Sequence, residues 1–171
     1  TNDLSDNKII FEKKNMSTTS TGGEKFVSNL QHHLFDGTND HLISSSDNFN
    51  FSRKDISFSF WFYNESSGSS DIILIQGNLS ERFFIQKSQN EKISLYTGTE
   101  LESNETINLN EWYHVICIVD YTNNKRYIYI NGELDNSDNG FARDLNNPNT
   151  VITIGRFLSF GNYLKGRLLD F

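Results

Sequence analysis

The chain has 171 residues, 22 acidic against 15 basic side chains and a net charge of −7, with an aromatic content of 13%. This length suffices for one packed domain, and the scattered basic residues argue against nucleic acid or an anionic membrane surface as partner, since both need clustered cations. No apolar run reaches the ~20 residues of a membrane span. Because the sequence starts at Thr1 without Met and ends at Phe171 inside an apolar run, we expect a single domain over residues 1–171, cut from a larger protein.

The first part of the chain is predicted to form short strands separated by polar turns. A leading strand is expected at residues 9–11, and Asp36-Gly37 predicts a turn between two short strands within residues 34–43. Residues 55–63 form the clearest predicted strand, because apolar and other residues alternate there. One face would carry Ile56, Phe58, Phe60 and Phe62, and the other Ser57, Ser59, Trp61 and Tyr63.

The second part continues the same pattern. Strands are expected at residues 71–76, 82–86, 92–97, 151–155 and 163–171, with a weak one at Thr106-Ile107 and a long turn-rich segment over residues 133–149. Short strands at intervals of about ten residues indicate antiparallel sheets, because a parallel sheet needs intervening helices. We therefore predict an all-β, two-sheet antiparallel sandwich.

The strongest local signal is a hairpin over residues 110–132. Two β-type runs flank a polar turn at residues 121–125, and the second run ends in the tight-turn dipeptide Asn131-Gly132. The basic pair Lys125-Arg126 is placed in the turn, and Trp112 in the core. The single cysteine, Cys117, lies mid-strand among aliphatic residues and is predicted to be a small buried hydrophobe.

Four stretches carry a resemblance when they are taken in order: residues 35–40, residues 58–62, residues 112–115 with 129–132, and residues 154–155 with 163–170. Together they resemble the laminin-G-like, concanavalin-A-like jelly-roll family. The strings Ser-Phe-Trp at 59–61 and Ile-Tyr-Ile-Asn-Gly at 128–132 are also similar to botulinum-type toxin binding domains. The resemblance implies a jelly-roll sandwich and a module that binds glycans or proteins. It does not specify the ligand, because the fold serves many functions.

Calcium is the cofactor that the resemblance implies. Calcium takes six to eight oxygen ligands, usually from several acidic side chains. The candidate metal ligands are Asp36, Asp40 and Asp170, with Asp135 and Asp138 as further donors. The alternative is that these aspartates cap turns. At Leu169 the closing strand departs from the family, which has an acidic residue there, and this weakens an acidic site at that end.

Carbohydrate binding generally uses flat aromatic side chains with polar neighbours. The strand alternation offers Trp61 and Tyr63 on one strand and Tyr127 and Tyr129 on another. The alternative is that this face packs under loops or against a neighbouring domain. A second possible platform consists of loop aromatics at the rim of the sandwich: Phe141, Phe157, Phe160 and Tyr163.

One stretch of the sequence resembles a catalytic motif. Glu133, Asp135 and Asp138 approximate the E-x-D-x-x-E motif of retaining jelly-roll glucanases, which need two carboxylates about 5 to 5.5 Å apart. However, Glu133 directly follows the Asn131-Gly132 turn and Asp138 is shorter than glutamate, so a solvated loop is expected instead.

The sequence therefore predicts a non-catalytic extracellular or surface module that binds glycan or glycoprotein. The alternative is a structural or protein-adhesion domain within a larger assembly such as a virion, fibre or toxin.

Overall fold

The computed structural model describes residues 11–14, 32–44, 51–77, 82–139, 150–158 and 161–170. These residues form strands joined by turns, and none of them is helical. The strands are β1 (Phe11–Lys14), β2 (His33–Asp36), β3 (His41–Ser44), β4 (Ile56–Asn64), β5 (Asp71–Gly77), β6 (Arg82–Lys87), β7 (Ile93–Tyr96), β8 (Glu100–Glu102), β9 (Trp112–Asp120), β10 (Lys125–Ile130), β11 (Glu133–Asn139), β12 (Ile152–Ile154) and β13 (Lys165–Leu169). The described part of the chain therefore holds no helix that could cross a membrane.

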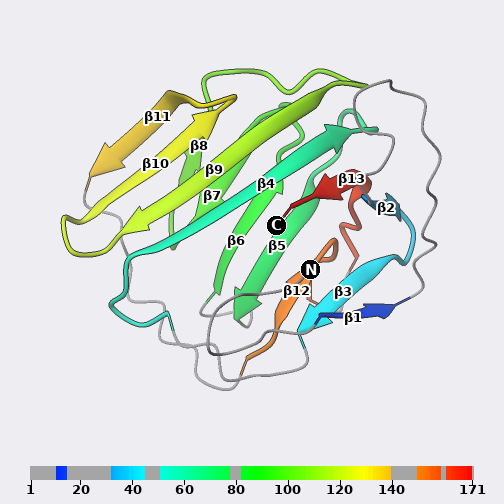
Figure 1. The fold of residues 1–171 in the computed structure, drawn as a ribbon, viewed down its shortest axis with the longest axis horizontal. Helices are drawn as coiled ribbons and strands as arrows, with labels where there is room; N and C mark the ends of the chain where they lie inside the picture. Colours follow the sequence, from blue (N-terminus) through cyan, green and yellow to red (C-terminus); the bar gives the residue numbers. More distant parts are fainter. Residues whose placement is uncertain are drawn as a thin grey trace.

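The strands build two antiparallel sheets packed as a jelly-roll sandwich (Figure 1). One sheet has the order β11-β10-β9-β4-β13-β2, and the other the order β1-β3-β12-β5-β6-β7-β8. We call them the six-stranded and the seven-stranded sheet. At the centre of the first, the long strands β4 and β9 pair over eight positions, from Ile56 opposite Val119 to Tyr63 opposite Trp112.

The core lies between the two sheets and follows the predicted alternation. Phe60 and Phe62 of β4 are buried, whereas Trp61 between them is exposed. On the facing sheet, Ile85 and Leu95 are buried in the same cluster. Burying large side chains such as these stabilises a fold by roughly 1.5–3 kcal/mol each.

Cys117 is fully buried in this core, as predicted. Burial raises the pKa of its thiol to about 12, so the reactive thiolate is scarce at neutral pH. We expect the folded protein to resist a thiol reagent such as DTNB and to react rapidly once it is unfolded in urea. Rapid labelling of the native protein would contradict the assignment of Cys117 to the core.

The backbone of the Asn131-Gly132 turn explains the register of β10 and β11. Both residues have positive φ, 52° and 88°, which a two-residue hairpin turn of this kind requires. As a result Ile130 lies directly opposite Glu133. Residues 133–139 therefore form the strand β11, and the prediction of a turn-rich segment there was wrong.

Four further details differ from the sequence expectation. Trp112 faces outward rather than into the core, because its neighbour Tyr113 takes the inward position. Thr106 and Ile107 form no strand, although Ile107 is fully buried, and the short strand β8 precedes them. The Lys125-Arg126 pair begins β10 instead of lying in the turn. Of the predicted leading strand, only Phe11 lies within the described residues, where it starts β1.

Candidate functional site

The four aromatic residues predicted from strand alternation share the outer face of the six-stranded sheet. Trp61 and Tyr63 come from β4, and Tyr127 and Tyr129 come from β10. The strand β9 lies between them and pairs with both. Since directly opposed residues in antiparallel strands point to the same side, the register places all four on one surface. We call this surface the outer face.

Strand β9 adds two aromatic side chains that the sequence analysis did not include in the site. Trp112 lies opposite Tyr63, with ring centroids 5.2 Å apart, and His114 lies opposite Trp61, with centroids 5.1 Å apart. The alternation of residues along β9 could have placed Trp112 and His114 on the outer face. Tyr113, Val115, Cys117 and Val119 are its buried residues, so the positions between them had to face outward.

Hydroxyl groups lie among these rings. Ser59 and the imidazole of His114 share a hydrogen bond of 3.0 Å between Oγ and Nε2. Further along the same face, Ser57 lies opposite Ile118, which in turn lies opposite Tyr127. Flat apolar rings with nearby hydroxyls suit the apolar face and the hydroxyl groups of a sugar.

The charges at the β13 side of the outer face are already paired. The guanidinium of Arg167 lies 5.0 Å from the centroid of the Tyr63 ring, and its Nε contacts Oε1 of Glu65 at 2.7 Å. His32 meets the Trp112 ring edge-on at 6.3 Å. Partial burial and the nearby Arg167 cation lower the pKa of His32, which favours its neutral form.

Two large apolar side chains on the described part of this face remain well exposed. Trp61 has 39% of its surface accessible, and Leu134, which lies opposite Tyr129, has 54%. These two apolar groups are available to a ligand.

Of the loop aromatics, Phe157 lies on the other sheet. Phe157 packs against Phe84, with ring centroids 6.3 Å apart, beside Ile72 and Ile75 of the seven-stranded sheet. Tyr163 is partly buried in the segment that precedes β13. Phe141 and Phe160 lie outside the described residues.

Of the three aspartates proposed for calcium, Asp36 and Asp40 lie close together and Asp170 lies apart from them. Asp36 and Asp40 lie at one turn, where Asp36 accepts hydrogen bonds from the amides of Thr38 and Asn39, and Asp40 accepts one from the amide of Asp36. Asp170 follows the far end of β13, whose first residue, Lys165, lies opposite Asp36. The separation along that strand exceeds ~13 Å. Among the described residues, no three His, Cys, Asp or Glu side chains are grouped so that they could hold one metal ion.

Electrostatics at that turn follow from the same hydrogen bonds. The backbone amides of Thr38 and Asn39 lower the pKa of Asp36, despite an opposing effect of burial. Burial raises the pKa of Asp40. Both carboxylates accept backbone hydrogen bonds in the turn between β2 and β3, and calcium binding by Asp36 and Asp40 stays a prediction.

The acidic residues of β11 have structural partners as well. Asp135 is the extra residue at an irregularity in the pairing of β10 and β11, and it accepts hydrogen bonds from the amides of Asn104 and Glu105. Asp138 forms an ion pair with the fully buried Arg126. These contacts occupy two of the three carboxylates that the glucanase motif would use.

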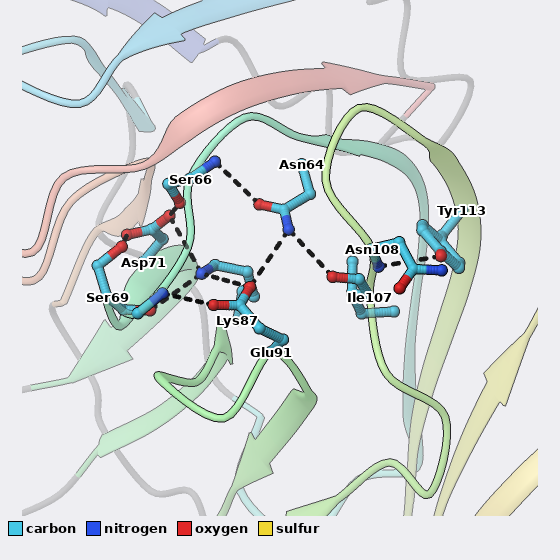
Figure 2. A network of polar contacts seen from close by, with 10 residues as sticks. Asn64, Ser66, Ser69, Asp71, Lys87, Glu91, Ile107, Asn108 and Tyr113 are labelled. Carbon is cyan, nitrogen blue, oxygen red and sulfur yellow. Dashed lines mark hydrogen bonds and ion pairs between the residues drawn. The ribbon is translucent and has the colours of Figure 1, made fainter.

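A buried polar network fixes the end of β4 that presents Tyr63 (Figure 2). At its centre the ammonium of Lys87, which is fully buried, donates hydrogen bonds to the carbonyl of Ser69 at 3.0 Å and to Glu91 at 3.1 Å. Asp71 lies 3.9 Å away and accepts hydrogen bonds from the hydroxyls of Ser66 and Ser69. These contacts tie the loop of residues 65–70 to the ammonium of Lys87 and to Asp71.

Asn64 connects this network to the sheet. Its side-chain amide donates to Glu91 at 3.3 Å and to the carbonyl of Ile107 at 3.1 Å, while its side-chain oxygen accepts from the amide of Ser66. Burial opposes ionisation of Glu91, but the Gly68 amide and Lys87 outweigh it and lower the pKa of this carboxyl. The stabilisation from Glu91 is therefore present above its ordinary pKa of 4.5 and is lost as the pH falls through the lowered value.

A sequence profile described as the concanavalin A-like lectin/glucanases superfamily, of the laminin G type, matches residues 36–171. The chain belongs to this superfamily. The resemblance seen in the four sequence stretches is thereby confirmed, as is the predicted jelly-roll sandwich. No curated protein matches the chain.

Several solved structures share the fold. Domain 4 of AbnA, an extracellular arabinanase from Geobacillus stearothermophilus solved with arabinotriose, has a TM-score of 0.68 and 12% identity over 95% of this chain and 82% of that one. The binding domain of Paraclostridial Mosquitocidal Protein 1 has a TM-score of 0.67 and 19% identity over 99% of this chain. The chain spans only 44% of that binding domain.

A third relative is a heptameric SAP-like pentraxin from Limulus polyphemus. Its TM-score is 0.64, with 14% identity over 81% of this chain and 73% of that one. Identities this low establish the shared fold and leave the ligand to be argued from the residues of the present chain.

Proposed function

We propose that this domain is a non-catalytic recognition module that binds carbohydrate on the outer face of its six-stranded sheet. The observation that carries the proposal is the gathering of aromatic side chains from three adjacent strands on one surface, with Trp61 left 39% exposed. Because folding leaves the indole of Trp61 this accessible, its apolar surface is free for a sugar ring to stack on and cover.

A non-catalytic role is supported by the use of the acidic residues. Asp135 and Asp138 hold backbone amides and a buried guanidinium, so they are committed to structure. A retaining glycosidase needs a facing pair of free carboxyl groups. An extracellular or surface location is part of the proposal, supported by the extracellular arabinanase and the mouse laminin α1 chain that share the fold.

Protein adhesion is the alternative use of the same surface. Leu134, 54% exposed beside Tyr129, favours it because an aliphatic side chain buries well against a protein partner and stacks poorly on a sugar. The partner would be another domain or subunit of a larger assembly.

A glycan array with matched variants tests the proposal. We expect Trp61→Ala to lower glycan affinity about tenfold or more, because it removes a stacking surface. Its free energy of unfolding should change by no more than about 1–2 kcal/mol, since the side chain is partly exposed. Trp61→Phe, which keeps a ring, should retain part of the binding.

Val151→Ala is the control, because Val151 is 38% exposed but lies beside β12 of the seven-stranded sheet. It should bind as the unchanged protein does. Binding that persists in EDTA would show that the domain holds the glycan without calcium. If Trp61→Ala instead unfolds the domain by several kcal/mol, Trp61 is a packing residue and this surface is not the site. A failure to bind any glycan would favour protein adhesion.

A further inference from the structure

The aromatic residues of the outer face extend across it in a line rather than gathering at one point. Alternate residues of β9 define four rows of paired residues across the sheet. The first row holds Trp112 and Tyr63, and the second holds His114 and Trp61. The third row contains Tyr129 and the fourth contains Tyr127. Successive rows are two residues apart, so the four rows span ~20 Å along the strands. The path also shifts from β4 to β10, a distance of about two strand spacings, or ~10 Å. This length is several times that of one pyranose ring.

Each cation on the described part of this face has an acidic neighbour. Arg167 is ion-paired with Glu65 at 2.7 Å. Lys125 lies directly opposite Asp120 in the pairing of β9 and β10, and Lys165 lies directly opposite Asp36 in the pairing of β13 and β2. An acidic glycan would need a cation that can turn to its carboxylate or sulfate, and here each one is opposed by a carboxylate of the protein itself.

From these two observations we infer that the ligand is an uncharged, unbranched polysaccharide chain that lies along the path from Tyr63 to Tyr127. The inference rests on the proposed function and narrows it. A terminal monosaccharide would use one ring of the path, whereas an extended chain places successive sugars on successive rows. The serines beside the rings, Ser57 and Ser59, are placed to accept hydrogen bonds from sugar hydroxyls.

Calorimetric titration with linear oligosaccharides of increasing length tests this inference. The probes are cello-, xylo- and manno-oligosaccharides from one to six units. For at least one series, each added sugar should increase affinity by roughly 2- to 10-fold until the chain covers the face, after which affinity levels off. Because the ligand is neutral, that affinity should change by less than about twofold between low and high salt, ~0.05 and ~0.5 M.

Tyr127 lies at one end of the path and gives a matched pair of variants. Tyr127→Ala should remove the gain from the last sugars of a long oligomer and leave the affinity of a disaccharide unchanged. Tyr127→Phe keeps the ring and should preserve the length dependence. An equal loss for short and long oligomers would contradict an extended site.

Two other results would overturn the inference in distinguishable ways. Binding restricted to sialylated or sulfated glycans, weakened steeply by salt, would refute a neutral chain while the proposed carbohydrate function survives. A single sugar that binds as tightly as a long chain would refute an extended site, and the proposed carbohydrate function would again survive. If no glycan binds at all, both the inference and the proposed function fail.

Discussion

Replacing Lys87 with alanine is expected to lower the free energy of unfolding by about 3–5 kcal/mol, because it removes a fully buried cation from two carboxylates, one of them nearly fully buried. Lys87 is fully buried, Asp71 is nearly so, and Glu91 is partly covered. Without the ammonium, the carbonyl of Ser69 also loses its donor. Urea denaturation followed by circular dichroism measures the loss.

A neighbouring lysine provides the control for this substitution. Lys92 is partly exposed and lies in the turn next to Glu91, so Lys92→Ala should change stability by no more than about 0.5 kcal/mol. Glu91→Gln should also destabilise the protein at neutral pH, and it should reduce the loss of stability at acidic pH that protonation of Glu91 causes. A Lys87→Ala protein as stable as the Lys92→Ala control would show that the network does not hold the loops at the end of β4.

Replacing Arg126 with alanine is expected to cost a similar amount, about 3–5 kcal/mol. Arg126 points inward from β10, and its guanidinium reaches the carbonyls of Leu95 and Thr99 at 3.3 and 2.7 Å. It also forms a two-point contact with Asp138 of β11. One side chain thus joins the edge of the six-stranded sheet to the β7–β8 turn of the other sheet.

The geometry of this contact gives a sharper test. Arg126→Lys keeps the positive charge but loses the planar fork that binds Asp138 at two points, so it should recover only part of the stability. The adjacent, exposed Lys125 is the control, and Lys125→Ala should be close to neutral. If Arg126→Lys were as stable as the unchanged protein, the contact with Asp138 would require only the positive charge and not the planar fork of arginine.

Strand alternation allowed much of this fold to be predicted from sequence. In β4 the phenylalanines and the residues between them separate cleanly onto two faces, because one side of the strand is buried and the other is open. The same rule put Trp61 and Tyr63 on one face of β4, and Tyr127 and Tyr129 on one face of β10. It could not show that the two strands lie on either side of β9, which is a matter of sheet order.

The residues that were misplaced are those whose chemistry conflicts with their position. Arg126 alternates inward with Ile128 and Ile130, but an arginine is expected in solvent unless distant partners are known. Lys87, for which no prediction was made from the sequence, is buried as well, and its partners include Ser69, which lies 18 residues away in the sequence. Trp112 was assigned to the core by its size, although the alternation of β9 indicated the outer face.

Strand β11 could not be predicted because its residues carry no apolar pattern. It lies at the edge of the six-stranded sheet, where polar residues on both sides are compatible with solvent. What determines the strand is the tight turn at Asn131-Gly132, which returns the chain beside β10. The turn was recognised in the sequence, and its consequence for residues 133–139 was not.

The central claim, that the outer face binds carbohydrate, is tested most directly by following intrinsic tryptophan fluorescence during titration with a glycan that the array identifies. The chain has two tryptophans, Trp61 and Trp112, and both lie on this face. We expect a saturable change in emission whose Kd equals the calorimetric Kd and which is largely lost in Trp61→Ala. Calorimetric binding with no change in tryptophan emission would place the site elsewhere and contradict the account.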